Sequence, residues 1–228
     1  SSRERLVDMG CPDAKIRVLP VGFDPARYPL TPRATYRRDG VLRLVSAGRI
    51  SEEKGHVYAL EALARLRADG FGDFHYTIIG GGRTDAVARV SGLISELGLD
   101  DVVHMAGELP SARVIAALGD ADALLLPSIQ YGDHAETQAA IVQEAMLMRA
   151  AIIVSDVGGV KECIPPFWSE WCIPPADPAT MTAAILKLSS RPVSELQKHT
   201  LAAREWTIQH YATAHLNDRL LEYIQEFR

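Results

Sequence analysis

Residues 42–82 read LRLVSAGRISEEKGHVYALEALARLRADGFGDFHYTIIGGG. Two short apolar runs in this stretch, Leu42–Ala47 and Tyr76–Ile79, are each followed by glycine. Between them, Val57–Ala68 carries its leucines at helical spacing. A buried strand, a helix and a second buried strand in this order are typical of a βαβ unit, in which the two strands pair in parallel. The stretch therefore predicts the core of a parallel sheet.

The same alternation continues along the chain. Three further runs are strand candidates: Val102–Met105, Leu124–Pro127 and Ile152–Ser155. Three helical patterns lie between them: Asp85–Leu97, Ser111–Leu118 with Ser111 as the expected N-cap, and Gln138–Met148. Near-continuous apolarity in such short runs suits parallel strands that are covered on both faces. We predict an α/β fold, a doubly wound, Rossmann-like parallel sheet flanked by helices.

The end of the chain reads as helix. After a proline-rich stretch at 165–178, helical spacing covers Val193–Arg228, with a bend expected around Gln209–Ala212. We therefore assign residues 1–192 to a Rossmann-like domain and 193–228 to a helical tail that packs on it or on a neighbouring domain. Because the chain opens without Met, in what reads as mid-helix, we expect it to be a piece of a longer protein.

The composition excludes several classes of protein. With 228 residues, 47% hydrophobic and 23% charged, the chain has the balance of a globular protein rather than of a disordered or fibrous one. Its cysteines, Cys11, Cys163 and Cys172, form no CxxC pair, so we expect a reducing, cytoplasmic setting without disulfides or zinc. No apolar run approaches ~18 residues, and no signal-peptide pattern opens the chain. A formal charge of −5 argues against nucleic-acid binding but leaves room for a local anion site.

The loop after the first predicted strand, Gly48–Gly55, is a candidate anion site. In open parallel sheets, ligands bind beyond the carboxyl ends of the strands, where such loops converge. Arg49 offers a planar fork for an oxygen pair, Lys54 offers a point charge, and the start of the following helix also favours anions. A solvated charged turn explains the same residues, and both interpretations remain open.

The loops after two other strands hold further candidates. Gly80-Gly81-Gly82 lets a backbone approach a ligand closely, although a glycine run is a weak signal. The loop after the fourth strand leads through Glu136 into a helix that carries Glu144 among apolar residues. A buried carboxylate needs partners, and two neighbouring hydroxyls of a ligand would serve. The alternative is that Glu144 faces solvent on an amphipathic helix.

The pair Asp120 and Asp122 invites a metal interpretation that we do not adopt. Both residues lie between a helix and the fourth strand, on the rim opposite the other loops, where helix-end capping and turn formation explain them. We expect no metal site. The histidines show no ligand spacing, and no nucleophile–base pair stands out.

The ordered set of these motifs resembles a known family. The set is Gly48-Arg49 with Lys54-Gly55, Gly80–Gly82, Pro127-Ser128, Glu136 and Glu144 with Ala145-Met146, then Ser155–Gly159 and Glu162. Together they resemble the nucleotide-sugar-binding C-terminal half of retaining family 4 glycosyltransferases, which have the GT-B fold. The opening Ile16–Asp24 is similar to the entry into that domain, and the resemblance covers roughly residues 10–190.

The resemblance implies a role for each candidate. Arg49, Lys54 and Glu136 would be the catalytic residues: the two cations would stabilise the departing diphosphate, and Glu136 would take hydroxyls of the transferred sugar. Glu144 would hold the ribose hydroxyls. The remaining donor-binding positions are Gly48, Gly80, Gly81, the base-framing backbone at Met105 and Leu109, and the backbone after Glu136 at Thr137, Gln138, Ala139 and Ala140. The family needs no cofactor and typically no metal.

Two departures from the family pattern bear on geometry. Thr137 and Ala139 replace glycines that the family usually has after its first glutamate, and Thr137 would narrow the sugar pocket. Arg149-Ala150-Ala151 stands where the family often has Gly-x-Pro, which puts the local backbone in question. Ser111, where guanine-selecting members can carry an acid, favours uracil.

The resemblance also implies partners. The donor would be a UDP-sugar, and the acceptor, a glycan, lipid or small molecule, would bind an N-terminal domain that this sequence lacks. We expect a cytoplasmic protein without a transmembrane segment, able to sit peripherally at the inner face of the membrane. A non-catalytic module that binds nucleotide sugars or docks a partner is the alternative. Another GT-B enzyme, an epimerase or a phosphorylase, fits less well.

Overall fold

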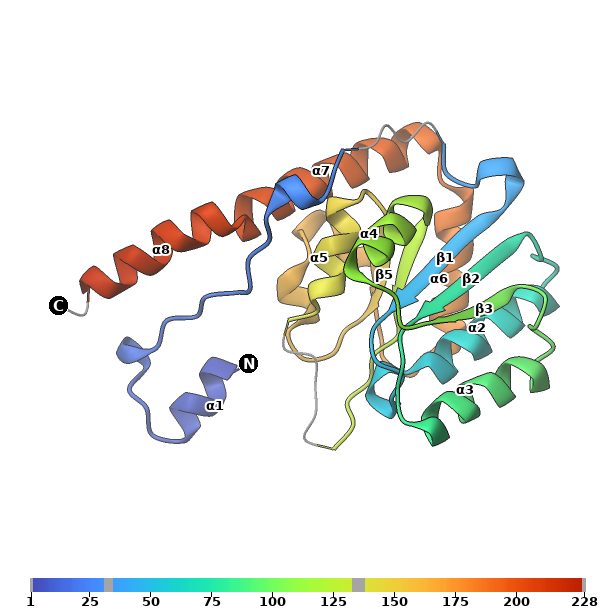
Figure 1. Cartoon of the computed structure of the whole chain (residues 1–228), viewed down its shortest axis with the longest axis horizontal. Helices are drawn as coiled ribbons and strands as arrows, with labels where there is room; N and C mark the ends of the chain where they lie inside the picture. Colours follow the sequence, from blue (N-terminus) through green and yellow to red (C-terminus); the bar gives the residue numbers. More distant parts are fainter. Residues whose placement is uncertain (1, 31–34, 133–137, 227–228) are drawn as a thin grey trace.

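A six-stranded parallel sheet forms the centre of the computed structural model, which describes residues 2–30, 35–132 and 138–226 (Figure 1). The strand order is β3-β2-β1-β4-β5-β6, and every neighbouring pair is parallel. The strands are β1 (Leu42–Ala47), β2 (Phe74–Ile79), β3 (Val103–Gly107), β4 (Ala123–Leu126), β5 (Ala151–Ser155) and β6 (Cys172–Ile173). The predicted α/β, doubly wound fold is confirmed.

Helices cover both faces of the sheet. They are α1 (Ser2–Asp8), α2 (His56–Ala68), α3 (Thr84–Glu96), α4 (Ser111–Asp120), α5 (Ala140–Leu147), α6 (Pro178–Ser190), α7 (Val193–Tyr211) and α8 (Thr213–Glu226). Helix α2 packs against α3 and α6, whereas α5 packs against α4 and α7. The crossover helices α2 and α3 lie on one face and α4 and α5 on the other, because the chain moves outward from β1 in one direction and from β4 in the other. No described helix has the length and apolarity needed to cross a membrane.

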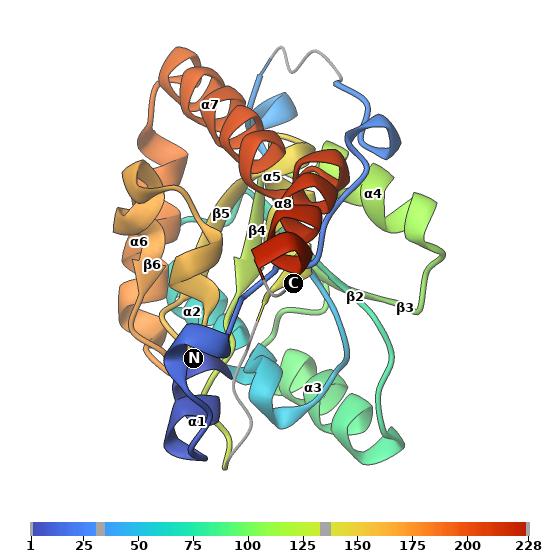
Figure 2. The same cartoon turned by 90° about the vertical axis from the view of Figure 1, so that its left-hand side faces the viewer.

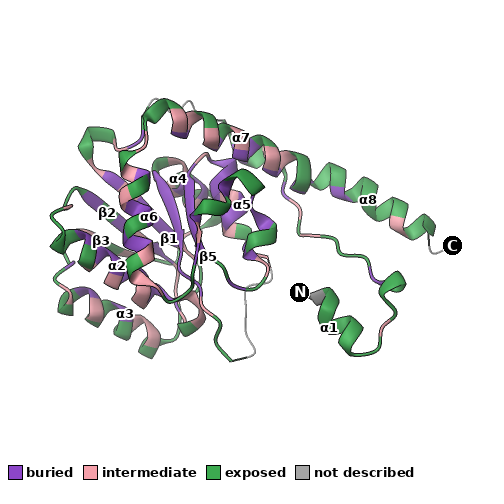
Figure 3. Cartoon of the chain, turned by 180° about the vertical axis from the view of Figure 1, so that it is seen from behind, coloured by how far each residue is buried: buried purple, intermediate pink, exposed green. Residues whose placement is uncertain are grey.

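The core lies in the sheet and in the helix faces that contact it. Strands β4 and β5 are buried along their whole length, as their uninterrupted apolar sequence predicts (Figure 3). Burying one leucine such as Leu124 or Leu125 contributes roughly 1.5–3 kcal/mol. A framework of this kind holds the loops at its carboxyl edge in fixed positions.

Two glycines allow the loops at that edge to touch. Gly55 has φ +62°, and a Cβ added to it would lie 2.0 Å from the carbonyl oxygen of Pro127. A Cβ added to Gly80 would lie 1.8 Å from the carbonyl oxygen of Gly48. The loops after β1, β2 and β4 therefore pack backbone to backbone, which a side chain at either position would prevent.

The tail consists of two helices rather than one. Helices α7 and α8 meet at Ala212, within the stretch where a bend was expected. Helix α8 continues from α7 beyond the sheet (Figures 1 and 2). The segment before β1 lies along this junction, since Phe23 forms a bridge with Ala212 and Arg17 Nη2 lies 2.7 Å from Glu226 Oε2. The division into domains at 192 stays a prediction.

Local sequence signals were less accurate at element ends. Ser111 is the first residue of α4, and its side chain forms no cap, so the predicted N-cap is wrong: the preceding Pro110 fills that position. Helix α5 begins at Ala140, two residues later than expected. After α5, Arg149 adopts φ +60°, a left-handed conformation that favours glycine, at the place where the sequence had put the backbone in question. The short strand β6 was missed because two residues carry no periodicity.

Candidate functional site

A cleft of about 560 Å³ opens at the carboxyl ends of β1, β2 and β3. The sheet reverses its winding between β1 and β4, and ligands of doubly wound folds bind beside this point. The cleft is lined by Ala47, Gly48, Arg49, Ile79, Gly80, Gly81, Gly82, Glu108, Leu109, Val114 and Ile141. Five predicted site residues, from three separate loops, are therefore brought together: Gly48, Arg49, Gly80, Gly81 and Leu109.

The two predicted cations lie on the loop after β1, where Arg49 lines the cleft and Lys54 lies beside it, and we call this side of the cleft the cation wall. The Arg49 side chain is 71% exposed, and its Nη2 lies 2.8 Å from Glu53 Oε1, four residues on. Lys54 ends a 3-10 turn directly before α2, and its Cε would lie 4.0 Å from a Cβ built on Gly48. An exposed ion pair such as Arg49–Glu53 is worth 1 kcal/mol or less, about the smallest of polar contacts. Arg49 can therefore exchange its partner for a phosphate at little cost.

The glycine loop has a second explanation. Gly81 approaches the Glu108 side chain, and Gly82 approaches the carbonyl oxygen of Ile50, each closely enough that a Cβ would clash. The loop therefore serves packing between loops as well as leaving the cleft open. Glu108 and the apolar Val114 also line the cleft, although the sequence did not single them out as site residues.

Glu144 lies next to a lining residue of the cleft and does not itself line it. It follows Ile141, which lines the cleft, by three residues, so the two side chains share one face of α5. Both residues are half-buried, and most of α5 around them is buried. The Tyr28 hydroxyl donates a hydrogen bond of 2.9 Å to Glu144 Oε1. The carboxylate is thus held by a partner rather than placed on a fully solvated face.

The turn that precedes α5 is described from Gln138 onward. Glu136, Thr137 and the neighbouring His134 lie outside the described residues. The Gln138 side chain accepts from Val21 N (2.7 Å) and donates to Val21 O (3.0 Å), a contact the sequence did not reveal. Ala139 is buried, and the Ala140 amide donates to Gln138 O within the turn. The Ala140 amide is therefore bonded locally in this structure, and its role as a donor to the ligand stays a prediction.

Of the two residues predicted to frame the base, only one lines the cleft. Leu109 follows β3 and lines the cleft, whereas Met105 lies inside β3, paired with Ile78, and does not line it. Asp122 has a structural role, because its Oδ2 accepts from the Arg43 amide at 2.8 Å between β4 and β1. Asp120 pairs loosely with Arg38 at 3.7 Å. These contacts give the two aspartates structural roles, as an acceptor between neighbouring strands and as a member of an exposed ion pair.

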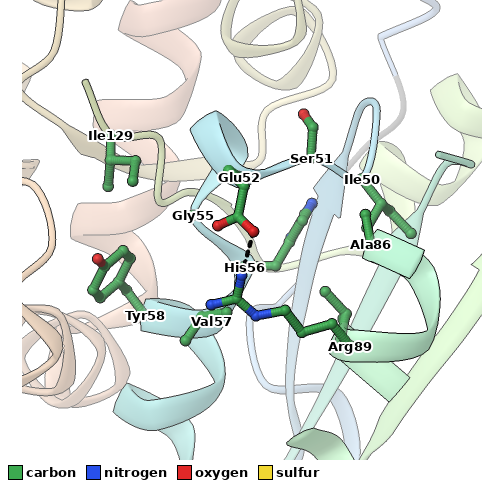
Figure 4. Close-up of a pocket in the computed structure, with 11 residues that line it drawn as sticks. Ile50, Ser51, Glu52, Gly55, His56, Val57, Tyr58, Ala86, Arg89 and Ile129 are labelled. Atoms are coloured by element: carbon green, nitrogen blue, oxygen red, sulfur yellow. Dashed lines mark hydrogen bonds and ion pairs between the residues drawn. The ribbon is translucent and has the colours of Figure 1, made fainter. Parts of the chain in front are cut away.

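A small cavity of about 60 Å³ lies against the loop after β1, at Ile50–Glu52 and Gly55 (Figure 4). Side chains from the start of α2, from α3 and from Ile129 surround it, and Glu52 pairs with Arg89 at its edge. His56 is 4% exposed, and neither ring nitrogen has a hydrogen-bond partner within the described residues. Burial, and then the charge of Lys54, lower the pKa of His56 to about 4. His56 is therefore neutral at physiological pH.

The fold and the cleft define a doubly wound α/β protein with a candidate ligand site, in which Arg49 lines the cleft and the hydrogen-bonded Glu144 lies beside it on α5. The family model described as "Glycosyl transferases group 1" matches residues 32–206. The chain belongs to this family.

Curated relatives include bacterial proteins that are named as biosynthesis glycosyltransferases. WcaL of Salmonella typhimurium, named for colanic acid biosynthesis, is 33% identical over 97% of this chain and 53% of its own length. AmsK of Erwinia amylovora, named for amylovoran biosynthesis, is 34% identical over 82% of this chain and 45% of its own length. The chain thus spans about half the length of these relatives.

Solved glycosyltransferases share the fold. A glycosyltransferase of Rickettsia africae matches the whole chain with a TM-score of 0.84 at 21% identity, over 62% of its own length. HepE of Anabaena, solved with UDP and glucose, matches 99% of the chain with a TM-score of 0.82 at 17% identity, over 61% of its own length. The predicted membership of a glycosyltransferase family and the Rossmann-like half of a GT-B fold are confirmed, whereas family 4 and the retaining mechanism stay predictions.

Proposed function

We propose that this chain is the donor-binding domain of a retaining family 4 glycosyltransferase. It would transfer a hexose-type sugar from a nucleotide diphosphate sugar to an acceptor held by a separate N-terminal domain. The observation that carries this proposal is the cleft lined by Arg49 and Ile141, with the half-buried Glu144 one helical turn from Ile141 on α5. A cation and a carboxylate near one cleft suit a ligand that has both phosphates and hydroxyls.

The cations and the glutamates would act on different parts of the donor. Arg49 and Lys54 would bind the diphosphate and stabilise the negative charge that develops as it leaves, which is usually the largest catalytic contribution. Glu144 would accept hydrogen bonds from the ribose hydroxyls, and Glu136 from hydroxyls of the sugar. The mechanism we propose uses no metal, because the two cations supply the charge that a metal would otherwise provide.

UDP is the nucleotide we favour. HepE was solved with UDP, and Ser111 stands where an acid would favour guanine. We also propose a cytoplasmic location, with peripheral attachment to the inner face of the membrane as an option. The acceptor would be a glycan, a lipid or a small molecule rather than a nucleic acid.

A thermal-shift panel with UDP, GDP, ADP and dTDP tests this function. A ligand at 100 times its Kd stabilises the folded chain by about 2.7 kcal/mol, which is an easily measured shift. We expect UDP to raise the melting temperature most. A panel in which no nucleotide shifts the transition would contradict nucleotide binding by this chain.

One observation favours a second candidate, a non-catalytic module that docks a partner. Helix α8 exposes Leu220, Leu221 and Ile224 beyond the sheet. The same apolar side chains would serve equally in packing against an acceptor domain. Sugar transfer by this chain together with an N-terminal domain would exclude the module, whereas nucleotide binding without any transfer would favour it.

A further inference from the structure

Tyr28 connects the segment before β1 to the carboxylate of Glu144. It follows a short 3-10 turn, Pro25–Arg27, and is 3% exposed. Its hydroxyl donates to Glu144 Oε1 at 2.9 Å across 116 positions of sequence. Burial and the negative charge of Glu144 raise the pKa of the Tyr28 phenol, so the hydroxyl keeps its proton and remains a donor.

Tyr28 is itself fixed from two sides. Its ring packs edge-on against Phe23, with 6.0 Å between the ring centroids. Its carbonyl oxygen accepts from Arg204 Nη2 at 2.8 Å, and the buried Arg204 also donates to the carbonyl oxygen of Leu147, the last residue of α5. One guanidinium therefore holds both Tyr28 and the helix that carries Glu144.

This arrangement determines which acceptor sites of Glu144 are available. A carboxylate has two oxygens with about four acceptor sites, and the bond from Tyr28 uses one site on Oε1. A free glutamate side chain samples several rotamers, and ordering it on binding lowers affinity. A carboxylate already held in one rotamer avoids that loss.

We propose that Tyr28 is a positioning residue that holds Glu144 in the rotamer in which it accepts the two hydroxyls of a nucleotide ribose. This inference rests on the proposed function. Tyr28 itself does not touch the ligand, and it acts through Glu144.

A double-mutant cycle tests this role. UDP affinity is measured by calorimetry for the wild-type chain, Tyr28→Phe, Glu144→Ala and the double variant. We expect Tyr28→Phe to weaken UDP binding roughly tenfold, since it removes one hydrogen bond to a charged group. In the Glu144→Ala background the same change should have no further effect, because the carboxylate that it positions is gone.

A second readout is the ratio of the affinities for UDP and for 2′-deoxy-UDP, which lacks one ribose hydroxyl. The wild-type chain should prefer UDP to 2′-deoxy-UDP, and Tyr28→Phe should reduce this preference. The ratio of the two affinities is independent of the folded fraction, so it remains informative if Tyr28→Phe lowers stability. A purely structural role would leave the ratio unchanged.

Tyr36→Phe is the matched control. Tyr36 is also buried, at 4% exposed, and its hydroxyl contacts Thr200 Oγ1 and Arg149 O, away from the cleft. Tyr36→Phe should lower the melting temperature and leave UDP affinity unchanged.

The outcomes separate the two proposals. Wild-type UDP affinity in Tyr28→Phe, or an equal loss in the Glu144→Ala background, overturns the role of Tyr28 while the proposed function stands. Unchanged UDP affinity in Glu144→Ala, or no UDP binding by the wild-type chain, overturns the ribose assignment and the role of Tyr28 together.

Discussion

The cation wall and the part of α5 that carries Glu144 are built in different ways. At the cation wall, Arg49 is largely exposed and pairs with Glu53, four residues away on the same turn. On α5, Glu144 is half-buried and held by Tyr28, which is 116 residues away. The cation wall is made by local sequence and can exchange partners easily, whereas Glu144 is fixed by a tertiary contact. For the donor site that we propose, this difference means an adaptable contact with the diphosphate beside a rigid contact with the ribose.

The largest expected effect comes from breaking the support of the cation wall. Gly55→Ala places a Cβ 2.0 Å from Pro127 O at a residue with φ +62°. We expect it to lower the free energy of unfolding by about 3 kcal/mol or more. Urea denaturation measures this change. Gly98→Ala is the control: Gly98 has φ +64° but no atom within 4 Å of the added Cβ, so a loss of about 1 kcal/mol is expected. Equal losses in both variants would show that loop contact is unimportant.

The second largest effect is expected from removing the Glu144 carboxylate. Glu144→Ala would eliminate the two charge-assisted hydrogen bonds to ribose that we propose, so we expect UDP affinity to fall by about 10- to 100-fold. Affinity for uridine should fall to a similar extent, because uridine keeps both hydroxyls. Calorimetry with both ligands gives the comparison. Glu96→Ala, at the end of α3, serves as control and should change neither affinity. Loss of UDP binding with uridine binding intact would contradict a contact between Glu144 and the ribose.

His56, at the start of α2, is a buried titratable group in the small cavity beside the loop after β1. Unfolded His56 binds a proton near its ordinary pKa of 6.5, whereas the folded chain does so near pH 4. The unfolded state therefore binds more protons between these values, and stability falls with decreasing pH by up to ~1.4 kcal/mol per pH unit. His56→Leu should flatten this part of the profile of unfolding free energy against pH. His104→Gln changes an exposed histidine and should leave the slope as it is. A slope that persists in His56→Leu would assign it to other groups.

Arg49→Ala should have the smallest effect and the most selective one. It removes one exposed cation, so we expect UDP affinity to fall about tenfold while uridine affinity stays constant. The loss should shrink at high salt, since exposed charges are screened. Arg83 is the matched control because it forms a similar exposed pair with Asp85 but does not line the cleft. An equal loss in Arg83→Ala would indicate a general charge effect.

The difference between local and long-range contacts also explains which features could be predicted from the sequence. The strands, the cation loop and the glycine loop are local patterns, and they were identified within a few residues of their observed positions. Arg49, Gly80 and Leu109 meet at one cleft because parallel strands bring the loops at their carboxyl ends together. That topology follows from periodicity alone.

Contacts between distant segments were not predictable in this way. Nothing in the residues around Tyr28 indicates that its hydroxyl reaches Glu144, or that Gln138 contacts the backbone of Val21. The prediction of Ser111 as the N-cap of α4 is wrong because Pro110 occupies that position. Helix propensities do not distinguish between two adjacent residues as the start of a helix. Met105 was predicted to frame the base together with Leu109, but only Leu109 lines the cleft, because β3 extends to Gly107 and Met105 lies inside it.

A crystal structure of this chain with UDP would show directly which groups of the nucleotide Arg49, Lys54 and Glu144 contact. We expect the diphosphate within hydrogen-bonding distance of Arg49 and Lys54. We expect the ribose hydroxyls on Glu144, which keeps its bond to Tyr28. A second groove of similar size, about 580 Å³, lies between α4 and the segment at Arg27 and Pro29. UDP bound in that groove, or bound in the cleft with its ribose away from Glu144, would contradict the donor site that we propose.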